Sequence, residues 1–399
     1  MGLRIKIWLL SCLLALLLTG CGLVTRTSPD PLPQKKKPAP EETEPQVELL
    51  QEPAPAPEPD LMPGPAVTVD GMELPGGSVR NGDVLYVRLQ ELVQALGTEL
   101  SWNEASGGGS FLWKEEPVCL AQRAASFRWG GRFYDLGETL LTAGGEVWVP
   151  VTALCRELGM GILEDPEEQH LYITPAAGSW TVPEGYRVPI LMYHGVTDET
   201  WGFAELFVSP ADMEAQLQYL ADNGYETIWF SDLARIDEIE KPVLLTFDDG
   251  YGDNYAELFP LLEKYRAKAT IFVVTASVDN NPRSLTAEQI REMAASGLVD
   301  FQSHTVTHPY LGSLTPEMQE QELCGSRLAL TRLTGRIPYV LCYPSGHFNQ
   351  TTVELTRKYY SFGVNMSGGT YTTAPDPYRI SRWYVPRDTG LAVFAAMLE

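Results

Sequence analysis

Hydrophobic and polar positions alternate in two different ways over roughly the last 220 residues of the chain. Apolar runs of strand length occur at 188–193, 243–247, 269–274, 299–302, 339–343 and 362–365. Between these runs, apolar residues recur at helical spacing, as at Met213, Leu217 and Leu220, and Gly224 then ends that segment. Strands that alternate with helices imply βαβ units and a parallel sheet. The pattern predicts an α/β domain over 182–399, a distorted (β/α) barrel with its functional residues at the strand ends.

An upstream stretch repeats itself at an offset of 62 residues. Segments 86–97 and 148–159 each have the pattern of a short strand, a helix with one apolar face, and a terminal glycine. This predicts a smaller α+β repeat domain over 66–175, N-terminal to the barrel. Its pattern resembles the copper amine oxidase N-terminal-like domain of bacterial wall proteins, which implies a spacer or wall-contact module. His170 is its only histidine, and we expect no copper there.

The first 20 residues have the features of a lipoprotein signal peptide. Arg4 and Lys6 precede the apolar run Trp8–Leu18, which is too short for a membrane span of about 20 residues. The run ends in Leu-Thr-Gly-Cys, which resembles a bacterial lipobox and makes Cys21 the lipidated mature N-terminus. An ordinary signal peptide that happens to end near a cysteine is the alternative. Lipidation predicts attachment to the outer face of the cytoplasmic membrane, at the cell surface.

Residues 21–65 predict a disordered tether. The stretch from Pro29 to Pro65 holds 12 of the 30 prolines, with Ala, Glu and Lys between them, and cannot bury enough apolar surface to fold. At about 3.1 Å per residue, such a polyproline-rich segment reaches about 100 Å. That length suits a domain working within a cell wall.

Charge and cysteine content narrow the function classes. Lys plus Arg number 29 and Asp plus Glu 52, a net charge of −23, which argues against nucleic acid and against polybasic attachment to anionic lipid. Apart from Cys12 and Cys21, the cysteines are Cys119, Cys155, Cys324 and Cys342. They lack the close spacing of a structural zinc site. A Cys119–Cys155 disulfide and buried free thiols both stay open.

Chemically useful residues gather at two predicted strand ends. Asp248 and Asp249 follow the strand at 243–247, and His304 and His308 follow the strand at 299–302. Either motif alone is more often a turn or a surface feature. Two such motifs at strand ends of one α/β domain indicate a functional site far more specifically than either motif alone. His194, which follows a third predicted strand, belongs to the same group of residues.

These residues resemble the motifs of the polysaccharide deacetylase family, the nodulation-protein-B type also called carbohydrate esterase family 4. The resemblance implies that Asp248 is the catalytic base and that Asp249, His304 and His308 bind a divalent metal. Three protein ligands leave positions open for water and substrate, as a hydrolytic metal requires. Nitrogen and oxygen ligands favour zinc, with cobalt, nickel, manganese and iron left open.

The remaining motifs match the family less regularly. In the third motif, at 341–346, Cys342 stands where the family often has an Arg that orients the base, and Ser345 replaces a Tyr. The resemblance places Tyr343 and Ser345 beside the substrate, with the Ser345 backbone amide as oxyanion donor. Arg382 begins a segment that resembles the fourth motif. It is either the missing partner of Asp248 or a member of a surface ion pair.

The fifth family motif, Leu-x-x-His, is missing from the C-terminus but matches residues 191–194. This arrangement resembles the circularly permuted exopolysaccharide deacetylases and makes His194 the candidate general acid. A buried structural histidine is the alternative.

Together these features predict a metal-dependent hydrolase that removes N-acetyl groups from N-acetylglucosamine-containing cell-surface polysaccharide. Peptidoglycan and poly-N-acetylglucosamine are both open as substrates. Two other classes also stay open: a catalytically inactive carbohydrate-binding wall protein, and an O-acetyl or xylan esterase using the same site.

Overall fold

The computed structural model describes residues 61–178, 181–374 and 376–399. The predicted signal peptide, Cys21 and nearly all of the predicted tether lie outside these residues. All described residues belong to one compact unit. None of the helices in the described ranges combines the length and the hydropathy that crossing a bilayer requires.

The small domain is built from two helices and short strands, most of which pair antiparallel. Its strands are β1 (Met62–Pro63), β2 (Ala66–Val69), β3 (Met72–Glu73), β4 (Val79–Asn81), β5 (Val84–Arg88), β6 (Ser101–Asn103), β7 (Gly108–Trp113), β8 (Glu116–Ala121), β9 (Ser126–Trp129), β10 (Arg132–Asp135), β11 (Leu141–Ala143), β12 (Glu146–Pro150), β13 (Gly161–Asp165) and β14 (His170–Thr174). Its helices are α1 (Leu89–Ala95) and α2 (Val151–Glu157). The sheets have the orders β1-β4-β5-β12-β11, β10-β9-β8-β7-β6 and β13-β14-β2-β3. The exception to the antiparallel pairing is that β2 and β14 pair in parallel.

The predicted internal repeat is confirmed in this domain. Strand β5 leads into α1 and strand β12 leads into α2, and the two strands pair antiparallel with Val87 opposite Val149. Each helix is followed by a glycine with left-handed backbone, Gly97 at φ 73° and Gly159 at φ 70°. Glycine suits this position because it has no Cβ to clash in that conformation. The two strand–helix units therefore meet at the centre of one sheet.

All four cysteines of the described ranges, Cys119, Cys155, Cys324 and Cys342, are free thiols. Cys155 is fully buried in the core of the small domain, and this burial raises the pKa of its thiol to about 12. Of the two alternatives for Cys119 and Cys155, the structure contains the unpaired one.

The C-terminal domain, which begins after residue 180, alternates strands with helices as predicted. Its strands are β15 (Arg187–Val188), β16 (Ile190–Tyr193), β17 (Gly195–Val196), β18 (Phe207–Val208), β19 (Glu226–Thr227), β20 (Pro242–Phe247), β21 (Ala269–Val273), β22 (Val299–Ser303), β23 (Val340–Cys342), β24 (Phe362–Val364), β25 (Tyr371–Thr372) and β26 (Trp383–Tyr384). Its helices are α3 (Pro210–Asp222), α4 (Phe259–Tyr265), α5 (Ala287–Ala295), α6 (Pro316–Thr334), α7 (Gln350–Tyr359) and α8 (Leu391–Met397).

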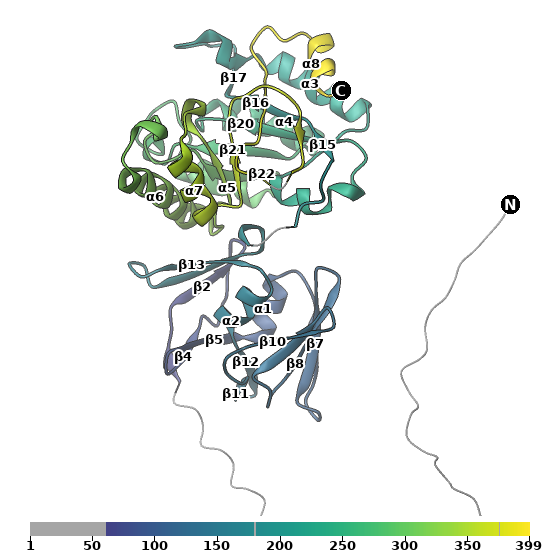
Figure 1. Ribbon diagram of the computed structural model, residues 1–399, viewed down its shortest axis with the longest axis vertical. Coiled ribbons are helices and arrows are strands. Elements are labelled where there is room, and N and C mark those ends of the chain that lie inside the picture. Colours follow the sequence, from purple (N-terminus) through teal and green to yellow (C-terminus); the bar gives the residue numbers. More distant parts are fainter. Residues whose placement is uncertain (1–60, 179–180, 375) are drawn as a thin grey trace, which may run out of the picture. The chain divides into compact units, whose positions relative to one another are not determined.

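The central sheet has the order β24-β23-β22-β21-β20-β16-β26, with β19 beside β20. Every one of these pairings is parallel, and every residue of β20, β21 and β22 is buried, as expected for strands covered on both faces. Helices α5 and α6 pack against β22 (Figure 1). A parallel bridge between Val364 and Ile380 links the β24 edge to the segment before β26. The fold is thus a mixed α/β fold with a curled parallel sheet.

Two features of this sheet shape the site. The apolar run 188–193 is interrupted at Pro189, which has no N–H, and β15 pairs with β25 while β16 alone joins the central sheet. Strand β16 lies between β20 and the last strand, β26, although it comes first in the chain. The residue that follows β16 is thereby placed beside the residue that follows β20.

Candidate active site

The predicted motif residues converge at the carboxyl edge of the curled sheet. Asp248 and Asp249 follow β20, His304 follows β22, and His194 follows β16. The register aligns Tyr193 with Phe247, and the backbone N–H of Asp248 donates to the carbonyl of Tyr193 over 2.9 Å. Because parallel strands end at the same edge, residues separated by more than 100 positions come into one region.

Asp249, His304 and His308 form a compact set of potential metal ligands. The Nε2 atoms of His304 and His308 lie 3.5 and 3.6 Å from Oδ1 of Asp249, and one ligand atom from each residue lies within 4.8 Å of the others. The Nδ1 atom of His304 lies 2.9 Å from the carbonyl oxygen of Cys342. A proton on Nδ1 donates to that carbonyl, which leaves the Nε2 lone pair facing Asp249. Burial also lowers the pKa of His304, favouring the neutral imidazole that metal coordination needs.

These three residues can therefore hold a divalent metal ion, with His308 half exposed at the solvent side of the set. A second group, Asp248, His304 and Cys342, has its ligand atoms equally close. There the Arg382 guanidinium already contacts both Asp248 and Cys342, and its positive charge opposes a cation at that position. The geometry favours the set that the motif predicted.

The backbone of this site adopts conformations that side chains seldom tolerate. Asp249, Thr305, His308 and Ser345 have φ angles of 73°, 68°, 59° and 53°. Residues in this left-handed region cluster at functional sites, where the surrounding structure holds them. Here Glu322 of α6 accepts the N–H groups of Val306 and Thr307 over 2.8 and 2.9 Å. Glu322 thus holds the loop that carries His308.

Asp248 and Arg382 form a buried bidentate ion pair. The two guanidinium Nη atoms lie 2.7 and 2.8 Å from the two carboxylate oxygens, and both side chains are buried. Burial alone would raise the pKa of Asp248, but the Arg382 charge outweighs it and holds that pKa well below its usual range. Asp248 is therefore ionised at neutral pH. Arg382 is therefore the partner of Asp248 and not a member of a surface ion pair.

All five N–H donors of Arg382 are satisfied. Besides Asp248, the guanidinium donates to Oγ1 of Thr246 over 3.0 Å, to the carbonyl of Asn365 over 3.1 Å and to Sγ of Cys342 over 3.1 Å. Cys342 therefore does not replace the Arg of the third motif chemically. The guanidinium comes instead from Arg382, just before β26, and Sγ of Cys342 accepts one of its hydrogen bonds.

His194 is buried beside Asp248, close enough for its charge to influence the Asp248 pKa. Two side chains after β20 hold the turn that carries it. Asn254 donates to the carbonyl of His194 over 3.0 Å, and Asp253 accepts the N–H of Val196 over 2.9 Å. A Cβ on the intervening Gly195 would clash with Cδ1 of Phe207 and would lie 3.0 Å from Oδ2 of Asp253, so this close approach requires glycine. Sequence reasoning missed this pair, although both residues continue the stretch that contains Asp248.

The third motif lies at the same edge, after β23. Ser345 is exposed there in its left-handed conformation. Tyr343, which we expected beside the substrate, is instead fully buried. Its N–H donates to the carbonyl of Val364 over 3.0 Å, and its hydroxyl donates to the carbonyl of Tyr378 over 2.9 Å. Both donors are engaged, so the position of Tyr343 is that of a structural residue.

Comparisons with known proteins give the family of the chain. A family model described as polysaccharide deacetylase matches residues 235–361. Over 219 residues the chain is 34% identical to YxkH of Bacillus subtilis (strain 168), which carries the same family name, with 53% of this chain and 76% of that protein covered. It is 26% identical over 199 residues to the poly-beta-1,6-N-acetyl-D-glucosamine N-deacetylase of a Staphylococcus epidermidis strain, covering 45% of this chain and 68% of that protein.

The chain is also similar to a deacetylase of known structure. The Streptococcus pyogenes deacetylase PplD, in complex with acetate, superposes with a TM-score of 0.51 at 30% identity, over 54% of this chain and 99% of that one. The chain belongs to the polysaccharide deacetylase family. It is a hydrolase of the deacetylase class.

Proposed function

We propose that this deacetylase removes N-acetyl groups from N-acetylglucosamine residues of a cell-surface polysaccharide, with a divalent cation held by Asp249, His304 and His308. The observation that carries the proposal is the closeness of these three ligand atoms to the buried Asp248–Arg382 pair. Two imidazole nitrogens and a carboxylate oxygen suit zinc best. When bound, such a cation polarises the acetyl carbonyl and acidifies water.

Two residues of the chain carry out the proton transfers, one as acceptor and one as donor. Asp248, kept ionised by Arg382, accepts the proton of the attacking water. His194 donates a proton to the leaving amine, and Asn254 and Asp253 fix the turn that presents its ring. The exposed backbone amide of Ser345 donates to the oxygen on which negative charge develops. Acetate leaves, and a free amine remains on the sugar.

Two polymers fit this reaction. The Staphylococcus epidermidis relative is named for poly-beta-1,6-N-acetyl-D-glucosamine, which favours an exported polymer of that kind. The predicted lipid on Cys21 and the predicted tether favour peptidoglycan, because they would hold the enzyme at the outer face of the cytoplasmic membrane. On this proposal the small domain is a copper-free spacer between tether and enzyme.

The test is acetate release from three substrates: poly-N-acetylglucosamine oligomers, purified peptidoglycan and acetylated xylan. Wild type is expected to release acetate from one of the first two and to leave acetylated xylan unchanged. Asp248→Asn, which nearly preserves shape, serves as the inactive control. Release from acetylated xylan alone would make the protein an esterase, and release from none by metal-loaded protein would make it a binding module.

A further inference from the structure

A cavity lies at the opposite end of the catalytic sheet from the candidate active site. Its volume is about 720 Å³. It is lined from the catalytic domain by the end of α7, the start of β24 and Arg327 of α6, and from the small domain by Arg156 of α2 and the residues that follow this helix. The start of a parallel strand is the far end from the edge where Asp248 lies. The cavity therefore does not belong to the site of deacetylation.

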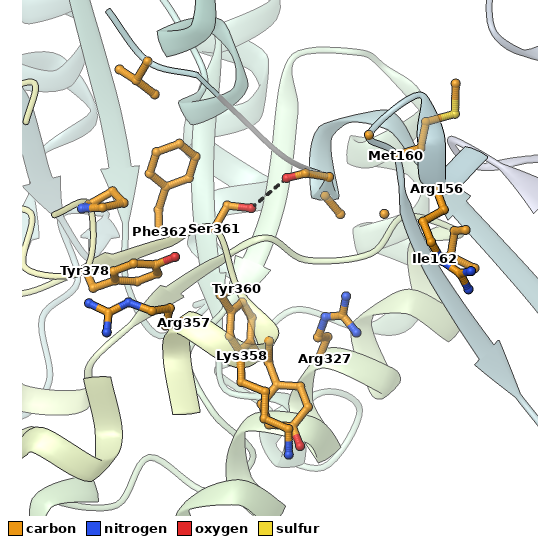
Figure 2. Close-up of a pocket in the computed structure, with 17 residues that line it drawn as sticks. Arg156, Met160, Ile162, Arg327, Arg357, Lys358, Tyr360, Ser361, Phe362 and Tyr378 are labelled. Carbon is orange, nitrogen blue, oxygen red and sulfur yellow. Dashed lines mark hydrogen bonds between the residues drawn. The ribbon is translucent and has the colours of Figure 1, made fainter. Parts of the chain in front are cut away.

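Polar contacts join the two domains, one of them at the wall of this cavity. Arg332 of α6 forms a bidentate pair with Asp165 of β13, at 2.6 and 2.9 Å. The hydroxyl of Ser361 donates to the carbonyl of Gly178 over 3.2 Å (Figure 2). Ser361 and Gly178 line the cavity, so their contact ties its two walls together, whereas Arg332 and Asp165 join the domains outside its lining.

The charge of the lining is opposite to that of the protein. Four cationic side chains line the cavity, namely Arg156, Arg327, Arg357 and Lys358, and its lining contains no Asp or Glu. The whole chain, in contrast, has a net charge of −23. Figure 2 shows Arg357 on one side of the opening, Arg156 on the other, and Arg327 between them. A cationic cavity in so acidic a protein attracts anions selectively.

Arg327 is the least compensated of these cations. Its Nε atom is buried and has no hydrogen-bond partner among the described residues. Burial lowers the pKa of its guanidinium, and the neighbours that oppose this effect are Tyr360, Cys324 and Tyr359 rather than a carboxylate. An unpaired buried cation is costly for a fold, and a bound anion would remove that cost.

Of the other cations, Arg357 has only loose partners, whereas Lys358 forms a close ion pair with Glu320, at 2.8 Å. The guanidinium of Arg357 lies 4.9 Å from the ring centre of Tyr378, and its nearest carboxylate, Asp376, is 3.9 Å away. Lys358 lies 4.7 Å from the ring centre of Tyr359 and pairs with exposed Glu320. The aromatic face of Tyr378 thus holds the Arg357 charge in place without neutralising it, whereas Glu320 balances the charge of Lys358. Positive charge is thus spread along the cavity instead of concentrated at one point.

We propose that this cavity binds a segment of an anionic polymer with repeating phosphodiester groups. Spaced cations fit repeated charges better than a single small anion. Guanidinium groups pair bidentately with phosphate oxygens, and phosphodiesters stay ionised at any pH at which the protein folds. The proposal does not depend on the deacetylation reaction, because the two sites lie at opposite ends of the sheet. Binding here would hold the catalytic domain among envelope polymers in addition to any lipid anchor.

The experiment measures calorimetric binding of a defined glycerol phosphate oligomer to the full chain in detergent. Wild type is expected to bind, and Arg327→Gln and Arg357→Gln each to weaken binding at least tenfold. The matched control is Arg291→Gln, which removes one exposed arginine of α5 outside this cavity and should change binding less than twofold. The thermal midpoint of Arg327→Gln should be no lower than that of wild type, and acetate release from a short soluble substrate should not change.

Three results would overturn the proposal. The first is no binding by wild type, and the second is equal weakening by Arg291→Gln and by the two cavity variants, which would reduce the effect to surface charge. The third comes from a parallel titration with poly-glutamate: if the carboxylate polymer binds as tightly and with the same Arg327 dependence, the phosphodiester assignment is wrong. If Arg327→Gln does not fold, Arg357→Gln decides alone, because its side chain is exposed.

Discussion

Arg382→Met tests whether the buried Asp248–Arg382 pair stabilises the catalytic domain. Met fills a similar volume but leaves the Asp248 carboxylate, only 3% exposed, without its counter-charge. Removing one partner of a buried ion pair typically costs about 3–5 kcal/mol. In a domain of this size each kcal/mol lowers the thermal midpoint by about 2–4 °C, so the expected loss is about 6–20 °C. The measurement is thermal unfolding at pH 7 with a chelator present, so that no metal contributes.

Two further variants separate charge from packing. Arg382→Lys keeps the charge but loses the bidentate geometry, and should lie between Met and wild type. Arg382→Met combined with Asp248→Asn removes both charges, and should be more stable than Arg382→Met alone, because no uncompensated carboxylate stays buried. Arg235→Met is the matched control: Arg235 is an exposed ion-pair partner of Asp232, and its loss should cost at most about 1 kcal/mol.

The reasoning fails if Arg382→Met costs less than about 1 kcal/mol, the value of an exposed pair. It also fails if the double variant loses the sum of the two single effects. Additive losses would show that the two side chains do not depend on each other in the folded protein.

Four other outcomes are expected. Asp249→Ala should lose bound metal and nearly all acetate release; full metal occupancy by elemental analysis would refute the ligand set. His194→Ala should keep its metal but lower kcat by roughly 10²–10⁴, the usual contribution of a positioned acid, and an unchanged pH profile would exclude that role. Asn254→Leu, which deletes the hydrogen bond to the His194 carbonyl, should lower kcat more than it changes KM, and should do nothing further in the His194→Ala background. Asp300 is buried, and this burial raises its pKa to about 6 although Tyr339 donates to it. The ionised form is therefore disfavoured in the folded state, so this cost is absent below about pH 4 and grows as the pH rises through 6. Asp300→Asn should consequently be more stable than wild type at pH 8, with an advantage that shrinks toward pH 5; a constant difference would contradict this.

Local patterns in the sequence determined the order of strands and helices and the motif residues of the candidate active site. Strand-length apolar runs and helical spacing predicted the alternating strands and helices of the catalytic domain, and the 62-residue offset predicted the paired β5–α1 and β12–α2 units. Asp248, Asp249, His304 and His308 were found because they follow strands within two short motifs. In a parallel sheet, a residue just after a strand lies at the carboxyl edge whatever the rest of the chain does.

Only the tertiary structure decided the partners of those residues. Arg382 reaches Asp248 across 134 positions, and its choice between a surface pair and this buried pair depended on where β26 inserts. Tyr343 looked like a substrate residue in its motif, yet the fold uses both of its donors internally. Glu322 and Asn254 support loops that carry His308 and His194 from elements that no motif connects.

The cationic cavity is the clearest example of a feature that only the tertiary structure decided. Arg156, Arg327 and Arg357 are far apart in the chain, and each looks like an ordinary charge of a helix surface. Periodicity along a chain reports which side of an element is apolar, because neighbouring turns and pleats repeat within a few residues. It cannot report which charges from different elements share one cavity, or which of them has no counter-charge, because those contacts exist only once the elements have packed.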